Sequence, residues 1–426
     1  MMIRMGIRCP GCEQPVAIRM ATDSTSGTRF YFPCPNCRLP IRGSAVGQDI
    51  SDYAVSFEAE RLSDHDVSLA PKVVTINPYV PNNFSADSHD AVGGFSMMAL
   101  NRLTGERVLD FMKERDTALG IIKQLWPQVR RLYEYYLDEQ WDAFESTLAR
   151  EFSEWDFPTG HTTHERASAA HSAMLAVTVN VVPPSAATAG FLRSYITKHV
   201  IAAADGRYSS MLKEDASIAE IKILQRSLFD VVDRFLLRHE MWLMGGIKRY
   251  LSATGAENVD HMTLARDEFG ETRDLYQQGF EVLGKVLKYP IAARNTIEHG
   301  HPENFGDQHP SNLPTKDRVD SFAKFNKLSN AYKLRYFQLD PGWVDFAKTM
   351  NSKTRNLIGH GVVRHDLRSG RIVTPSDTNG VNYLVFLGNL HDLFDSLSVT
   401  LQVLQAVRIT SSTDWPESNR TKSRQC

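Results

Sequence analysis

Four of the five cysteines stand in two pairs whose spacing suits metal binding. Cys9 and Cys12 enclose Pro-Gly, and Cys34 and Cys37 enclose Pro-Asn, with 21 residues between the pairs. Zn²⁺ prefers four ligands in a tetrahedron, and a short CxxC turn presents two thiolates together. Because cysteines fill all four positions, no coordination site stays open for water. The pattern therefore predicts a structural zinc ion as cofactor.

The segment that holds these cysteines resembles a zinc ribbon over residues 1–45. Val16–Met20 and Thr28–Phe32 have the composition of strands and fit a β-ribbon that links the two turns. Zinc ribbons bind nucleic acid or protein, or only staple a small domain. The local excess of arginine favours nucleic acid, and a folding staple with solvated arginines is an equal alternative. The arginines are Arg4, Arg8, Arg19, Arg29, Arg38 and Arg42.

Two later segments share the pattern R-N-x-I-x-H-G, each at the end of a predicted helix. The first contains Arg294, Asn295 and His299, and the second contains Arg355, Asn356 and His360. Asparagine and histidine four residues apart share one helix face, and the long arginine side chain can lean toward them. Glycine is typical just beyond a helix. The pattern predicts a cation, an amide and an imidazole together at each helix end.

Such a set suits RNA cleavage by internal transesterification. An imidazole can remove the proton of the 2′-hydroxyl at neutral pH. A guanidinium can stabilise the negative charge that develops on the phosphate. The 2′-hydroxyl is itself the nucleophile, so this reaction requires no metal. The alternative is that the arginine and histidine act only as favourable cations at the carboxyl ends of helices.

The second copy resembles the Rx4–6H motif of HEPN ribonucleases, best over about residues 315–408. These are metal-independent endoribonucleases found as toxins, anti-phage defence effectors and RNA-guided CRISPR ribonucleases. The resemblance implies that Arg355 binds the scissile phosphate, Asn356 orients it and His360 acts in acid–base catalysis. It assigns the same roles to the first copy. Because HEPN sites usually combine two motifs across a dimer, the two copies act within one chain or in a homodimer.

A predicted hairpin over 362–373 directly follows His360. Its arginines, Arg364, Arg368 and Arg371, are positioned in sequence to follow an RNA backbone beside the motif. The alternative is an ordinary solvated hairpin.

A second, weaker metal pattern joins His161, His164, Glu165 and His171. Its order is not the HExxH of zinc peptidases, so surface histidines are the simpler interpretation. The sequence contains no P-loop, no GxGxxG and no GxSxG, which disfavours nucleotide-driven and serine-hydrolase chemistry.

The composition is that of an ordinary globular protein. Of 426 residues, 42% are hydrophobic and 23% are charged, with a net charge of −2. A chain without a strongly basic field must contact RNA through local patches. The start lacks the apolar region of a secretory signal, and the longest apolar stretch, Ala173–Val182, is far shorter than the roughly 20 residues that span a bilayer. We therefore expect a cytoplasmic protein with no membrane segment.

Apolar residues recur at three- and four-residue steps along most of the chain, which predicts helices. The expected helices cover residues 106–155, 189–203, 216–252, 270–299, 315–337, 341–360 and 380–408. Strands are expected over 53–57 and 73–76, and an irregular connection over 157–187.

The predicted fold class is mainly α, with a HEPN-like helical bundle in the C-terminal region and a small N-terminal β zinc ribbon. The expected divisions are a zinc ribbon (1–45), a β-rich connecting segment (46–100), a helical domain (101–310), a HEPN-like helical domain (311–410) and a disordered tail (411–426). The first motif extends the HEPN resemblance to the domain 101–310.

Two functions follow from these patterns. The first is a metal-independent endoribonuclease of HEPN type, a toxin or defence effector whose partner is RNA. The second is a non-catalytic adaptor that binds nucleic acid or protein through its zinc ribbon and helical bundle. In the adaptor, the two R-N-x-I-x-H-G segments are signatures of the fold only.

Overall fold

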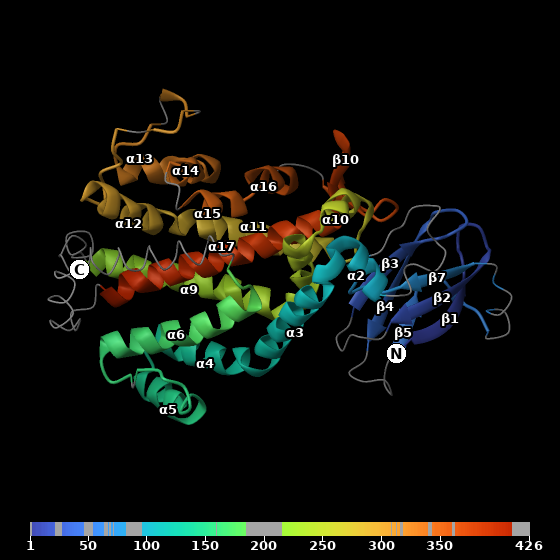
Figure 1. Ribbon diagram of the computed structural model, residues 1–426, viewed down its shortest axis with the longest axis horizontal. Coiled ribbons are helices and arrows are strands. Elements are labelled where there is room, and N and C mark those ends of the chain that lie inside the picture. The colour runs from blue at the N-terminus through green and yellow to red at the C-terminus, as the bar shows by residue number, and fades with distance from the viewer. Residues whose placement is uncertain are drawn as a thin grey trace. The chain divides into compact units, whose positions relative to one another are not determined.

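The computed structural model describes most of the chain and is mainly helical, with small β-sheets near the N-terminus (Figure 1). The described residues are 2–21, 28–46, 54–63, 67, 70, 72–81, 96–158, 160–184, 215–307, 309–311, 313–315, 318–339, 343–359 and 363–410. The chain divides into two compact units. The first unit comprises Met1–Lys113, His239–Asp274 and Asn356–His391, and the second comprises Glu114–Arg238, Leu275–Arg355 and Asp392–Cys426.

Two small sheets of the first unit are built around the cysteine pairs. One sheet has the strand order β6-β1-β2-β7, from β1 (Met2–Arg8), β2 (Pro15–Ala21), β6 (Glu60–Arg61) and β7 (Val73–Ile76). The other has the order β3-β4-β5, from β3 (Thr28–Pro33), β4 (Pro40–Val46) and β5 (Ala54–Phe57). Each CxxC forms the turn of one hairpin, β1–β2 or β3–β4.

The strands expected at 16–20 and 28–32 are confirmed, but they do not pair with each other. They lie in β2 and β3, which belong to different sheets. The reason is local: a CxxC turn reverses the chain within a few residues, so each strand pairs with its neighbour across the turn.

The strands expected at 53–57 and 73–76 are confirmed as β5 and β7, and they are integral to the ribbon. β5 pairs with β4, β7 runs parallel to β2, and the short β6 pairs with β1. Residues 46–100 thus contribute strands to both ribbon sheets, where the sequence suggested only a connection. The alternate residues that face inward form one buried core. Its members are Met5, Ile7, Cys9, Val16, Ile18, Met20, Phe30, Phe32, Cys34, Ile41, Ala45, Val74, Ile76 and Ala265.

The last member of that core, Ala265, comes from far along the chain. Residues 265–267 pair with the outer edge of β3, where Phe30 and Arg266 form an antiparallel bridge. The Tyr31 N–H donates to the Ala265 carbonyl at 3.2 Å, and the Asp267 N–H donates to the Arg29 carbonyl at 3.1 Å. This pairing gives partners to an edge strand that would otherwise expose unpaired backbone groups.

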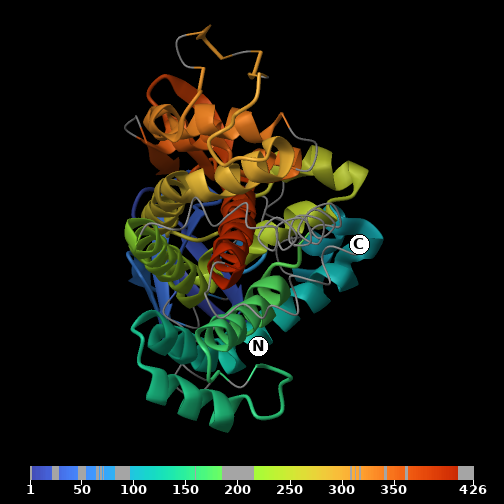
Figure 2. The same cartoon turned by 90° about the vertical axis from the view of Figure 1, so that its left-hand side faces the viewer.

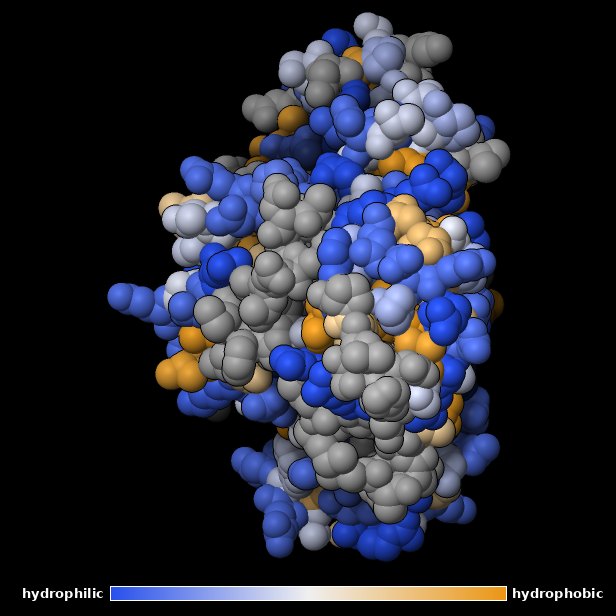
Figure 3. Space-filling view, turned by 90° about the vertical axis from the view of Figure 1, so that its right-hand side faces the viewer, coloured by the Kyte–Doolittle hydropathy of each residue, from blue (hydrophilic) through white to orange (hydrophobic). Residues whose placement is uncertain are grey.

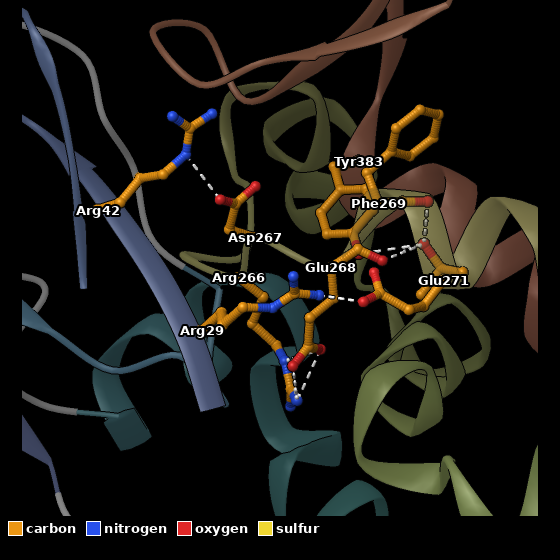
Figure 4. A network of polar contacts seen from close by, with 9 residues as sticks. Arg29, Arg42, Arg266, Asp267, Glu268, Phe269, Glu271 and Tyr383 are labelled. Atoms are coloured by element: carbon orange, nitrogen blue, oxygen red, sulfur yellow. Dashed lines mark hydrogen bonds and ion pairs between the residues drawn. The ribbon is translucent and has the colours of Figure 1, made fainter. Parts of the chain in front are cut away.

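Side chains of the same segment alternate between the interior and the surface (Figure 4). Inward, Arg266 and Glu268 form an ion pair with an N–O distance of 2.8 Å, and their side chains are 3% and 4% exposed. The Arg266 guanidinium also donates to the Glu240 carbonyl at 2.6 Å. Outward, Asp267 accepts from Arg42 at 2.8 Å, and Glu271 pairs with Arg29.

The rest of the first unit is a set of short helices and a third small sheet. The helices are α2 (Ser96–Thr104), η3 (Gly105–Arg107), η4 (His239–Met241), η5 (Leu243–Tyr250), α10 (Ala253–Asn258) and η6 (Val259–His261). The sheet has the order β10-β9-β8, from β8 (Arg364–Asp366), β9 (Arg371–Thr374) and β10 (Asp377–Asn382). The hairpin expected over 362–373 is confirmed as β8–β9, and β10 extends it.

The second unit is a bundle of helices. They are α4 (Trp126–Leu137), α5 (Trp141–Glu151), α6 (Thr163–Val181), α9 (Asp215–Leu237), α12 (Lys288–His299), α13 (Phe322–Lys327), α14 (Asn330–Phe337) and α15 (Val344–Thr349). Four further helices contain residues of both units: α3 (Val108–Gln124), α11 (Phe269–Val286), α16 (Ser352–Gly359) and α17 (Tyr383–Thr410). α4 packs against α5, α6 and α9 (Figures 1 and 2). Phe235 of α9 contacts Phe394 of α17, with ring centroids 5.6 Å apart.

Several expected helices are interrupted in the structure. The stretch 216–252 ends as an α-helix at Leu237 and continues as η4 and η5, which contain Gly245 and Gly246. Likewise 270–299 divides into α11 and α12, 315–337 contains α13 and α14, and 341–360 contains α15 and α16. The final helix, expected over 380–408, is confirmed as α17. The helix expected at 189–203 and the tail at 411–426 lie outside the described residues.

The connection expected over 157–187 was wrong, because most of it is the regular helix α6. The Glu165 N–H donates to the Thr162 hydroxyl, and the Glu165 carboxylate accepts the Thr162 N–H, both at 3.1 Å, which completes a capping box. Alanine, the best helix former, recurs along the segment and outweighs its threonines and histidines. No helix within the described residues is long and apolar enough to cross a membrane.

Gly245 is required by a close approach between η5 and α17. A Cβ atom at this position would lie 2.1 Å from the Leu387 carbonyl oxygen. We expect Gly245→Ala to lower the free energy of unfolding by about 1–3 kcal/mol or more, because backbone must move. Gly270→Ala is the control, since no atom lies within 4 Å of its Cβ position. It should be neutral or stabilise by up to about 1 kcal/mol. Urea unfolding of both variants measures the difference, and equal effects would contradict this packing.

His365 of β8 is partly buried and lies among aromatic rings of the first unit. Its Nε2 lies 3.3 Å from the Tyr31 hydroxyl, and its ring centroid lies 4.5 Å from that of Tyr383. Burial lowers the pKa of His365 from 6.5 to about 4. The unfolded chain therefore takes up a proton near pH 6.5, whereas the folded chain takes it up only near pH 4.

The stability that neutral His365 contributes should be complete above pH 6.5 and lost as the pH falls toward 4. The depressed pKa corresponds to a loss of up to about 3 kcal/mol. His365→Phe should flatten the pH dependence of urea unfolding between pH 7 and 4.5. His261→Gln, which changes an exposed histidine, should leave it as steep as in the wild type. An equally steep curve for His365→Phe would refute the assignment.

Candidate functional site

The four cysteines of the ribbon come together in one cluster. Their sulfur atoms all lie within 4.8 Å of one another. The Sγ atoms of Cys9 and Cys37 are 3.6 Å apart, and those of Cys12 and Cys34 are 3.8 Å apart. A tetrahedron with Zn–S bonds of about 2.3 Å has S–S edges of about 3.8 Å. The cluster therefore has the size that a four-thiolate metal site needs, and it contains no disulfide.

The two CxxC turns repeat the same local geometry. The Gly11 N–H donates to Cys9 Sγ, and the Asn36 N–H donates to Cys34 Sγ, both at 3.4 Å. The residue after each second cysteine is left-handed: Glu13 has φ 57° and Arg38 has φ 63°. N–H groups that point at the sulfurs stabilise thiolates and orient the ligands. The backbone is thus arranged for metal binding at both turns.

Burial differs between the two cysteines of each pair. Cys9 and Cys34 are buried members of the ribbon core, whereas Cys37 is exposed. Burial raises the pKa of Cys34 to about 12, so metal binding at this thiol requires a cation that displaces its proton. Among the described residues, this is the only group of histidine, cysteine or acidic side chains that could hold a metal ion. The identity of the metal rests on the ligand set, which suits zinc.

The histidines of the weaker metal pattern have other partners. His161 Nδ1 lies 3.6 Å from a Glu145 carboxylate oxygen, and Glu165 is occupied by the capping box. His171 is partly buried, and this desolvation lowers its pKa to about 4. These residues stabilise the start and the packing of α6.

The first R-N-x-I-x-H-G copy is largely buried at the end of α12. Arg294 is 6% exposed and Asn295 is 0% exposed. The Asn295 amide donates to the Pro302 carbonyl at 2.9 Å, which fastens the following loop to the helix. His299 is half-buried, with Nε2 enclosed next to Gly306. Gly300 has φ 77° and ends the helix, as the glycine of the motif predicts.

The second copy lies at the end of α16 and is more accessible. The Arg355 guanidinium donates to a Glu281 carboxylate oxygen at 2.9 Å, with the two side chains 30% and 52% exposed. Asn356 is exposed. His360 lies outside the described residues.

The hairpin arginines divide into two kinds. Arg364 and Arg368 are exposed. Arg371 instead holds the backbone of its own unit: it donates to the carbonyls of Asn379, Asp260 and Gly380, the last two at 3.2 and 3.4 Å. Arg371 therefore fastens the backbone of β10 and η6 rather than offering a free cation.

The buried Arg266–Glu268 pair was not expected from the sequence. Two charged residues two positions apart are typical of a solvated strand or loop. No local signal marked the pair, because its burial depends on β3, which lies more than 200 residues earlier in the chain.

No protein-family model, curated protein or solved structure matches this chain.

Replacement of a buried ligand tests the metal centre. We expect one zinc ion per wild-type chain by mass spectrometry of the metal content, and less than one tenth of that for Cys34→Ala, since three thiolates leave the site incomplete. Cys426→Ser, which removes the cysteine outside the two pairs, should keep full zinc. Hydrogen exchange of β1–β5 should rise only in Cys34→Ala. Retention of stoichiometric metal by Cys34→Ala would show that the four sulfurs do not form the site.

Proposed function

We propose that this protein is a metal-independent endoribonuclease of HEPN type and that the second R-N-x-I-x-H-G copy performs the cleavage. The observation that supports this assignment is the difference in exposure between the copies. Arg294 and Asn295 are enclosed and used in packing, whereas Arg355 is partly exposed and Asn356 is exposed on the last turns of α16. In the proposal, a phosphate therefore approaches Arg355 and Asn356.

In the proposed reaction, the 2′-oxygen of a ribose attacks the adjacent phosphorus. A new P–O bond forms, the bond to the 5′-oxygen of the next nucleotide breaks, and the products carry a 2′,3′-cyclic phosphate and a 5′-hydroxyl. His360 takes the proton of the 2′-hydroxyl. Arg355 neutralises the charge that develops on the phosphate, and Asn356 orients it.

Substrate must displace Glu281 from Arg355. The pair is on the surface, where such ion pairs contribute about 0–1 kcal/mol, so a phosphate can exchange for the carboxylate at little cost. The same ion pair also favours the non-catalytic alternative, because Glu281 already neutralises the charge of Arg355 without any substrate. Variants of Glu281 and Arg355 separate the two interpretations.

Because the first copy is enclosed, a second motif for a composite site would have to come from another copy of the chain. We propose a homodimer on this ground. The toxin or defence role, and RNA as the partner, belong to the same proposal.

The test compares RNA cleavage by the wild type with that by single variants. We expect His360→Ala and Arg355→Ala to lower the cleavage rate of a single-stranded RNA at least 100-fold, with no added divalent cation. Glu281→Gln should keep or raise the rate, because it releases Arg355. Lys353→Ala, an exposed cation on the same helix, is the matched control and should cleave as the wild type does.

Products should end in a 2′,3′-cyclic phosphate, which mass spectrometry of the fragments detects. If wild type and His360→Ala leave RNA equally intact, or nick it equally, the nuclease proposal fails and the adaptor remains.

A further inference from the structure

Among the described residues, the outer face of the sheet β6-β1-β2-β7 is covered in part. Side chains alternate along each strand, so Arg4, Gly6 and Arg8 of β1 share the face opposite the core. A Cβ at Gly6 would lie 2.4 Å from Val67, which packs there with Ala17 and Leu62. This apolar cluster covers the centre of the face.

The uncovered end of the same face carries two arginines side by side. Arg4 of β1 and Arg19 of β2 are direct cross-strand partners, and both are exposed. Thr75 of β7 is the next residue across the sheet, in register with Arg19. Like charges directly opposite each other destabilise a sheet. The strands therefore hold two positive charges together against their mutual repulsion.

Other arginines of the ribbon are committed to carboxylates of their own unit. Arg8 lies 3.3 Å from Glu60, Arg42 lies 2.8 Å from Asp267, and Arg29 pairs with Glu271. In contrast, no ion pair or hydrogen bond of the Arg4 and Arg19 side chains occurs within the part of the chain that the structure describes. The surface drawn in Figure 3, on the side where Figure 1 labels β1, β2 and β7, is mostly hydrophilic among its described residues.

We propose that Arg4 and Arg19, with the Thr75 hydroxyl beside them, form a phosphate-binding site for the backbone of RNA on the outer face of the ribbon. The Cβ atoms of two directly paired residues such as Arg4 and Arg19 lie about 5 Å apart. Their guanidinium groups can therefore hold one phosphate between them or two successive phosphates. An exposed pair of arginines on a sheet contacts phosphate groups and not base edges. The site therefore binds single-stranded RNA of any sequence. This site deepens the proposed function by supplying substrate binding separate from the cleavage motif.

The experiment uses the full zinc-loaded chain with His360→Ala as background, so that RNA is bound and not cut. Fluorescence anisotropy with a labelled single-stranded RNA 20-mer gives Kd as a function of salt. Arg4→Gln with Arg19→Gln should raise Kd roughly 10- to 30-fold at 0.1 M salt. It should also lower the slope of log K against log salt by about 1.4, because two phosphate contacts are lost.

The matched control removes the same charge from exposed positions elsewhere in the first unit, by Arg102→Gln with Lys113→Gln. It should leave the slope unchanged. The Arg4/Arg19 variant should keep its zinc and melt at the same or a higher temperature, since relief of repulsion cannot destabilise the sheet.

Three results overturn the site: equal slopes for the two double variants, a zinc content or melting temperature that falls in the Arg4/Arg19 variant alone, or binding of the pair to phosphatidylserine vesicles without binding to RNA. Failure of the nuclease proposal looks different. In that case, binding depends on the two arginines, but RNA stays intact whether or not His360 is present.

Discussion

The first unit depends on one constraint, the convergence of four thiols from two hairpins. The hairpins β1–β2 and β3–β4 belong to different sheets, and within the described residues no strand ladder joins β2 to β3. Two of the sulfurs, those of Cys9 and Cys34, are also part of the core between the sheets. Small sheets bury little apolar surface, and a metal ion held by the four thiolates would cross-link the two hairpins at their shared end. The buried faces of both sheets, and thereby the partly covered outer face of the first, follow from that convergence.

The elements that the sequence predicted well are those encoded locally. CxxC spacing is a property of four consecutive residues, and the strand composition of β2 and β3 needs only a short window. The long helix α17 likewise follows from a continuous apolar repeat. Where helices were interrupted, at Leu237 or between α11 and α12, the apolar spacing continued through the break, so periodicity alone gave no sign of it.

The pairing between distant segments could not be predicted in this way. β7 pairs in parallel with β2, although a long stretch of chain separates the two strands. The segment 265–267 pairs with β3, although it lies nearly two hundred residues after β7. In the sequence, Arg266 and Glu268 are typical of surface charges. In the fold they are buried, because their segment pairs with β3. The two R-N-x-I-x-H-G copies show the same limit at the candidate site. Their letters match, yet the Pro302 carbonyl and the residues around α12 enclose Asn295, whereas Asn356 stays exposed. Which face of a helix is covered is decided by other parts of the chain.

The late arrival of residues 265–267 at β3 has a consequence for biosynthesis. A ribosome that adds about 5–20 residues per second completes the two hairpins roughly 10–50 seconds before it supplies the segment that pairs with their open edge. During that interval, β3 presents unpaired N–H and C=O groups to any neighbouring nascent chain. Early binding of a metal ion would hold the two hairpins together before residues 265–267 pair with the edge of β3. The exposed edge of β3 thus lasts from the completion of the two hairpins until residues 265–267 are synthesised.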